Sequence, residues 1–115
     1  MTDAAAIDLA TYEALEETTG ADFVVELVDT FLAEAPPMLD DLRHALAAGE
    51  ADRFRRAAHS LKSNANTFGA LALGALAREL ELGGFDRARA ADAPLEALAR
   101  EYARAAAALT ELRNA

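Results

Sequence analysis

Residues 52–69 read DRFRRAAHSLKSNANTFG. At about 100° of rotation per residue, the apolar side chains of this stretch fall within one sector, which is the face expected to be buried. The stretch therefore predicts a helix from about Asp52 to Phe68 that packs through one side, with Asp52 as its N-cap and Gly69 as its terminating residue. The predicted buried face consists of Phe54, Ala57, Ala58, Leu61, Ala65 and Phe68.

The residues before this helix also carry apolar side chains at helical spacing. Asp8 can cap a short helix that ends at Thr19-Gly20. A longer stripe over residues 22–48 crosses Pro36-Pro37 in register, so it predicts either one kinked helix or two abutting helices, ended by Gly49. This stripe consists of Val24, Leu27, Val28, Phe31, Ala35, Met38, Leu42 and Leu46.

Two more helices are predicted after residue 69. An apolar stripe from Leu73 to Leu80 indicates a helix that ends at the breaker Gly83-Gly84. A helical turn is possible over residues 86–91. Pro94 then fits the first turn of a last helix, whose apolar residues from Leu95 to Leu112 alternate three and four apart, as antiparallel bundle helices require.

Length and composition favour a single helical domain. The chain has 115 residues, enough to bury roughly two-thirds of its unfolded surface, and its thirty-one alanines favour helix over sheet. We therefore predict an all-α fold, an antiparallel up-down four-helix bundle with a short N-terminal cap helix. The bundle is expected to be one domain over residues 1–115, with residues 1–6 as a flexible tail.

Charge and cysteine content limit the classes of partner. The formal net charge of −9 argues against nucleic acid and anionic membranes, because both would repel the chain. No cysteine is present for a disulfide or a thiolate metal site, and no apolar run approaches the roughly 18 residues that cross a bilayer. The start of the sequence lacks a basic segment followed by an apolar one. We therefore expect a cytoplasmic protein with protein partners.

The arrangement of basic residues singles out one histidine. Ten of the eleven basic residues are arginines, and the one lysine, Lys62, follows His59 by three positions, about one helical turn. A lysine supplies a mobile point charge that can follow a phosphoryl group, beside a potential nucleophile. His59 lies opposite the predicted buried face, and the neighbouring Arg53, Arg55, Arg56 and Lys62 indicate a local anion site in an acidic protein.

Most lone histidines on a helix surface are simply solvated, and His44 fits that interpretation. It lies off the apolar stripe and has Arg43 rather than a lysine beside it. His59 differs because it combines predicted exposure, a basic surround and the spacing to Lys62.

Residues 58–70, Ala-His-Ser-Leu-Lys-Ser-Asn-Ala-Asn-Thr-Phe-Gly-Ala, resemble the signature of histidine-containing phosphotransfer (HPt) domains. In that family the histidine is followed by lysine at three, a small residue at four and glycine at ten, positions filled here by His59, Lys62, Ser63 and Gly69. The place of Ser63 is usually glycine, so the chain departs from the pattern there. The resemblance extends over nearly the whole chain, because Leu46 to Gly49 and the Leu73, Ala77, Glu81 pattern also resemble family features.

The resemblance implies a phosphoryl carrier of a two-component phosphorelay. His59 would carry the phosphoryl group between aspartates of receiver domains, Lys62 would neutralise its charge, and Glu81 would hold the other ring nitrogen. The expected partners are response-regulator receiver domains and a hybrid histidine kinase, with Mg²⁺ on the receiver and no cofactor or metal on this chain, which is expected to be monomeric. We expect the partner-binding surface to include Arg55, Arg56, Ser63, Asn66 and Gly69.

Two other functions remain open from the sequence. The bundle could be an interaction module that docks on a kinase or receiver domain without carrying phosphate, although His59 and Lys62 argue against this. The other is an enzyme in its own right, such as a histidine kinase or a carboxylate-bridged metal bundle. Neither has support, because no glycine-rich nucleotide loop follows a strand and no Glu-x-x-His pair occurs for a di-metal site.

Overall fold

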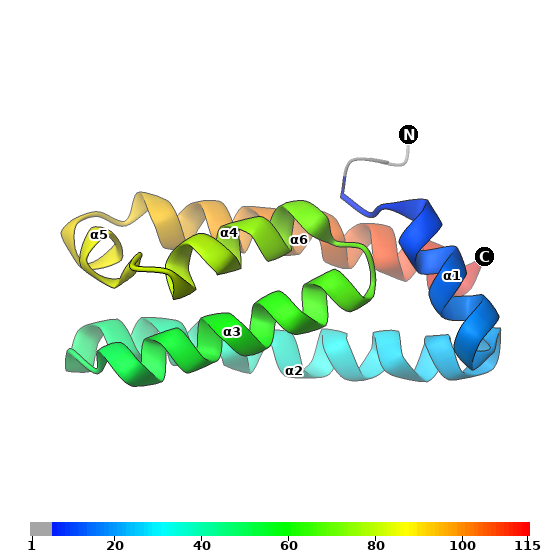
Figure 1. Ribbon diagram of the computed structural model, residues 1–115, viewed down its shortest axis with the longest axis horizontal. Coiled ribbons are helices and arrows are strands. Elements are labelled where there is room, and N and C mark those ends of the chain that lie inside the picture. Colours follow the sequence, from blue (N-terminus) through cyan, green and yellow to red (C-terminus); the bar gives the residue numbers. More distant parts are fainter. Residues whose placement is uncertain (1–5) are drawn as a thin grey trace.

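The computed structural model describes residues 6–115, and this part of the chain is helical without any strand (Figure 1). The prediction of an all-α fold is confirmed, and the possible turn over residues 86–91 is a short helix of its own. None of the described helices is long and apolar enough to cross a membrane. The helices are α1 (Leu9–Thr19), α2 (Ala21–Ala48), α3 (Ala51–Thr67), α4 (Leu71–Glu81), α5 (Phe85–Ala90) and α6 (Ala93–Asn114).

Four of the helices, α2, α3, α4 and α6, lie side by side. Helix α3 contacts α2 and α4, and α6 contacts the other sides of α2 and α4, so that the four enclose one core (Figure 1). Helix α1 lies across one end, where it contacts α2 and α3, while α5 lies near the opposite end. The core is lined by alanine and leucine with few large rings, which lets the helices approach closely.

Helix α2 runs through Pro36 and Pro37 without interruption, which decides between one helix and two. Proline removes a backbone donor and crowds the preceding turn, but burial of the same face before and after the pair offsets that cost. Leu39 takes the buried place predicted for Met38, which is only partly buried. The buried residues of α2 are Val24, Val28, Phe31, Ala35, Leu39, Leu42 and Ala45.

Most predicted helix ends are confirmed. The Asp8 carboxylate accepts a hydrogen bond from the Thr11 backbone N–H at 3.2 Å, and Gly49 ends α2 in the left-handed conformation, with φ of 72°. The predicted N-cap of α3 is wrong. The helix begins at Ala51, so Asp52 lies inside its first turn, where its carboxylate binds Arg55 instead of capping the backbone.

The N-terminal segment is packed from Ala6 onward, which corrects the predicted tail. Ala6 and Ile7 are 1% and 2% exposed, and residues 1–5 of the expected tail lie outside the described residues. The Asp8 backbone N–H donates to the Gly69 carbonyl at 2.7 Å, which ties the start of α1 to the end of α3. A side chain on Gly69, whose φ is 85°, would lie 2.6 Å from the Asp8 carbonyl oxygen.

Gly69 is therefore a structural residue, and its assignment to the partner-binding surface is wrong. It is buried under the start of α1, where a docking protein cannot reach it. Its positive φ allows the chain to turn from α3 into α4 within three residues.

Candidate functional site

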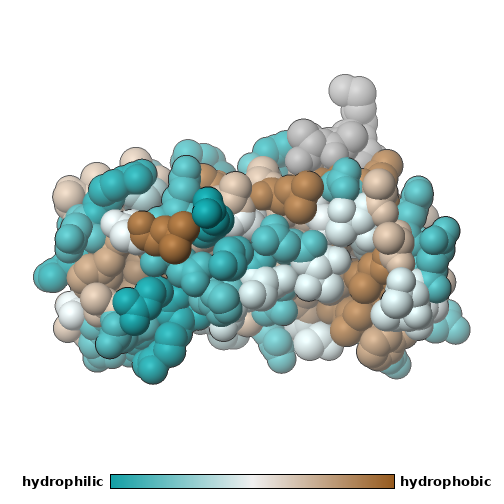
Figure 2. Space-filling view, viewed as in Figure 1, coloured by the Kyte–Doolittle hydropathy of each residue, from teal (hydrophilic) through white to brown (hydrophobic). Residues whose placement is uncertain are grey.

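His59 lies in the middle of α3, on the side that faces solvent. The opposite side of the helix is fixed in the core by Phe54, Ala57, Ala58, Leu61 and Ala65, as predicted. The imidazole is 58% exposed, so a second protein can reach it. The surrounding face of the molecule is largely hydrophilic, with separate hydrophobic patches (Figure 2).

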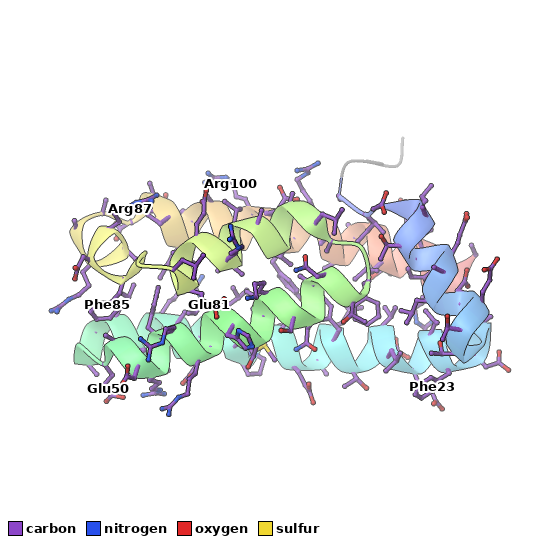
Figure 3. The ribbon with its side chains drawn as sticks, viewed as in Figure 1. Phe23, Glu50, Glu81, Phe85, Arg87 and Arg100 are labelled. Carbon is purple, nitrogen blue, oxygen red and sulfur yellow. The ribbon has the colours of Figure 1, made fainter. Side chains whose placement is uncertain are left out.

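Glu81, near the end of α4, bridges the two residues that the sequence singled out. Its Oε2 lies 2.7 Å from His59 Nδ1, and its Oε1 lies 2.7 Å from Lys62 Nζ. The Glu81 side chain is 15% exposed and that of Lys62 is 23% exposed, so the bridge is more protected than the ring itself. Figure 3 shows Glu81 reaching from α4 toward α3. The structure thus brings His59, Lys62 and Glu81 together.

The bridge determines which ring nitrogen is available for chemistry. Two hydrogen bonds hold the pKa of Glu81 below its usual value, the larger effect coming from Lys62 and the smaller from His59. This carboxyl is therefore ionised at neutral pH. An ionised carboxylate only accepts hydrogen bonds, so Nδ1 of the neutral ring carries the proton and donates it. The lone pair of the neutral imidazole is then on Nε2, the nitrogen not engaged by Glu81.

Gly74 allows α3 and α4 to approach closely enough for this bridge. It is buried on α4, and a side chain there would collide with the Asn66 side chain of α3. Gly74 was not predicted from the sequence to have a structural role. The sequence did contain a signal for this role, a glycine inside a helix otherwise rich in alanine and leucine. Glycine destabilises a helix interior, so its presence there indicates that packing requires it.

The expected anion site around His59 is largely neutralised, which corrects that interpretation of the basic residues. Arg53 donates its Nε–H to Asp41 of α2 at 2.8 Å, and Arg55 pairs with Asp52 at 2.6 Å. With Lys62 held by Glu81, three of the four basic residues already have carboxylate partners. The face therefore carries paired charges rather than a positive field.

A hollow of about 490 Å³ lies beside this face, between α2 and α3. Its lining combines the apolar Met38 and Ala57 with the charged Asp41 and Arg56, and it reaches Ser60, the neighbour of His59 in sequence. The hollow gives a docking partner an apolar contact on the α2 side of α3.

The remaining predicted surface residues lie where the sequence placed them. Arg55, Arg56, Ser63 and Asn66 are exposed on α3, although the Asn66 side chain also covers Gly74. His44 is exposed on α2, as expected. Within residues 6–115 no group of three or more histidine, cysteine, aspartate or glutamate side chains is arranged to hold a metal ion.

An exposed histidine whose second nitrogen is held by a carboxylate on the next helix agrees with the resemblance described above, and comparisons of the whole chain decide the family. The Hpt domain model matches residues 26–115. The chain belongs to the Hpt domain family. No curated protein sequence matches it.

This Hpt domain is similar to a solved structure over nearly its full length. Histidine-containing phosphotransfer protein B (HptB) from Pseudomonas aeruginosa PAO1 superposes with a TM-score of 0.84 at 31% sequence identity, and the match covers 95% of each chain. Because it covers 95% of the chain, this match extends beyond the family-model match, which begins at residue 26.

Proposed function

We propose that the protein is a histidine phosphotransfer protein of a two-component phosphorelay, with His59 carrying the phosphoryl group between aspartates of receiver domains. The observation that carries this proposal is the exposed ring of His59, bridged through Glu81 to Lys62. We also propose that α2, α3, α4 and α6 form an up-and-down four-helix bundle capped by α1. The protein is further proposed to be a cytoplasmic monomer.

The chemistry follows from the free Nε2 of His59. Its lone pair attacks the phosphorus of an aspartyl phosphate, forming an N–P bond while the P–O bond to the aspartate breaks and its electron pair leaves on the carboxylate. Nδ1 keeps its proton, so the phosphorylated ring becomes positive, and the adjacent Glu81 carboxylate stabilises that charge. The step reverses when a second receiver offers a free aspartate.

The protein needs few catalytic groups of its own. Phosphoryl transfer depends largely on positioning and charge neutralisation, so a nucleophile held in one orientation with a cation nearby suffices on this side. The receiver supplies the aspartate and is expected to supply Mg²⁺. A hybrid histidine kinase is the expected source of the phosphoryl group.

Labelling with phosphorylated receiver domains tests the function. We expect one acid-labile, base-stable phosphate per chain after incubation with a cognate phosphorylated receiver, and no label from ATP and Mg²⁺ alone. Labelling by ATP alone would indicate a kinase. A receiver that binds the protein tightly but passes no phosphate to it would favour the interaction module.

We place the docking surface on the exposed side of α3, around Ser63 and Asn66, with the hollow on its α2 side. Ser63 lies one helical turn beyond His59 and is exposed, so bulk there obstructs an approaching aspartate without entering the core. We expect Ser63→Gln to slow phosphoryl transfer in both directions and leave the melting temperature nearly unchanged. Ser63→Gly should keep the wild-type transfer rate, although the helix loses about 0.5 kcal/mol.

Stopped-flow transfer from a phosphorylated receiver, together with thermal unfolding, measures both effects. If the Ser63→Gln variant transferred phosphate at the wild-type rate, the receiver would have to dock on another surface of the molecule.

A further inference from the structure

The Lys62 ammonium is bound to the Glu81 carboxylate. The Nζ–Oε1 distance is 2.7 Å, and the lysine is held on the carboxylate that also accepts from His59 Nδ1. The two side chains are only partly exposed, so water screens their attraction less than that of a fully exposed pair. In this state the ammonium neutralises Glu81.

Phosphorylation redistributes the charges around this carboxylate. Before transfer, one negative charge on Glu81 faces a neutral ring and the Lys62 ammonium. Afterwards the ring itself is positive at Nδ1, 2.7 Å from Glu81, so the carboxylate has a second cationic partner. The phosphoryl group on Nε2 adds two negative charges with three strong acceptor oxygens on the solvent side of the ring.

Both changes favour the same movement of the lysine. The positive ring replaces Lys62 as the charge partner of Glu81, and the phosphoryl oxygens offer the ammonium a more negative site about one helical turn away. Lysine suits such an exchange because its charge sits on a flexible four-carbon stem with rotatable donors. The 23% exposure of Lys62 leaves its amino group a route to the solvent side.

We propose that Glu81 holds Lys62 in a resting position and that phosphorylation of His59 transfers the ammonium from Glu81 to the phosphoryl group. This inference rests on the proposed function, since it requires His59 to be phosphorylated. It makes Glu81 a positioning residue for the cation as well as for the ring, and it makes the location of one side chain depend on the phosphorylation state.

The sequence provides a direct probe, because Lys62 is the only lysine. Protein grown with lysine labelled at ¹³Cε and ¹⁵Nζ gives a single side-chain amino signal in NMR, without assignment ambiguity. The spectrum is recorded for wild type and Glu81→Gln, each before and after phosphorylation by a receiver. Glu79→Gln is the matched control, because it removes the same charge from an exposed position on the same helix.

We expect four results. Phosphorylation shifts the wild-type signal; Glu81→Gln shifts the signal of the unphosphorylated protein; Glu79→Gln does not. The phosphorylated forms of wild type and Glu81→Gln then give nearly the same signal, because Lys62 has left residue 81 in both.

Two outcomes overturn the inference without touching the proposed function. One is a wild-type signal that stays in place although ³¹P NMR shows a phosphohistidine. The other is a phosphorylated wild-type signal that remains as sensitive to Glu81→Gln as the unphosphorylated one. Absence of any phosphohistidine signal would instead count against the proposed function itself.

Discussion

Replacing His59 with glutamine is expected to abolish phosphoryl acceptance. Glutamine retains a polar side chain on the exposed face of α3, but its amide nitrogen has no lone pair available for attack on phosphorus. Since the ring points into solvent and contributes nothing to the core, the variant should fold with nearly wild-type stability. Labelling by a phosphorylated receiver, followed on Phos-tag gels or by ³¹P NMR, should show no phosphohistidine.

His44→Gln is the matched control, because it makes the same change at an exposed histidine of α2. It should accept phosphate at the wild-type rate. Two results would show that His59 is not the carrier: acid-labile phosphate on the His59→Gln variant, or failure of the His44→Gln variant to accept phosphate.

Lys62→Ala is expected to slow transfer by about tenfold to a thousandfold at saturating receiver, with a much smaller effect on receiver binding. The ammonium matters most where charge is redistributed on the moving phosphoryl group, and that stage follows docking. The variant also leaves Glu81 without its cation, so part of the loss reflects a changed environment around Nδ1. Rapid-quench kinetics at saturating receiver measures the effect on the transfer rate. A separate measurement of the dissociation constant gives the effect on receiver binding.

Two controls sharpen this test. Lys62→Arg keeps the charge but replaces a mobile ammonium with a planar guanidinium, so it should recover only part of the rate. Arg43→Ala removes a cation from the exposed surface of α2, where it pairs with Asp40, and should leave transfer unchanged. Equal saturating rates for Lys62→Ala and wild type would remove Lys62 from the mechanism.

The helices were predictable because their signals are local. Glycines at 20, 49, 69 and 83 mark the ends of helices, and each has a positive φ in the structure. The local sequence could not show whether α2 continues through Pro36-Pro37, because that depends on the packing of the segments on both sides. The start of α3 was misplaced by one residue because Asp52 prefers a carboxylate–guanidinium contact with Arg55 over a backbone cap.

The site was predictable only in part, for a related reason. His59 and Lys62 share one helix, so their spacing alone places them on one face. Glu81 came from the family resemblance, and the structure confirms its proximity to His59, while its chemical role stays a prediction. The partner of Arg53 was missed because Asp41 lies on another helix and no sequence period connects the two. The partner of Arg55 is Asp52, three positions away on the same helix.

The α3–α4 connection has a consequence for how the site assembles. His59, Lys62 and Glu81 all belong to one helical hairpin joined by residues 68–70, and His59 and Glu81 are only 22 positions apart. Bringing them together closes a short loop, which costs little chain entropy and favours rapid folding. The register of this hairpin alone sets their contact, because sliding α4 by one residue would rotate Glu81 about 100° away from the ring. One inserted residue between Phe68 and Ala70 could thus uncouple the carboxylate from the histidine while every helix still formed.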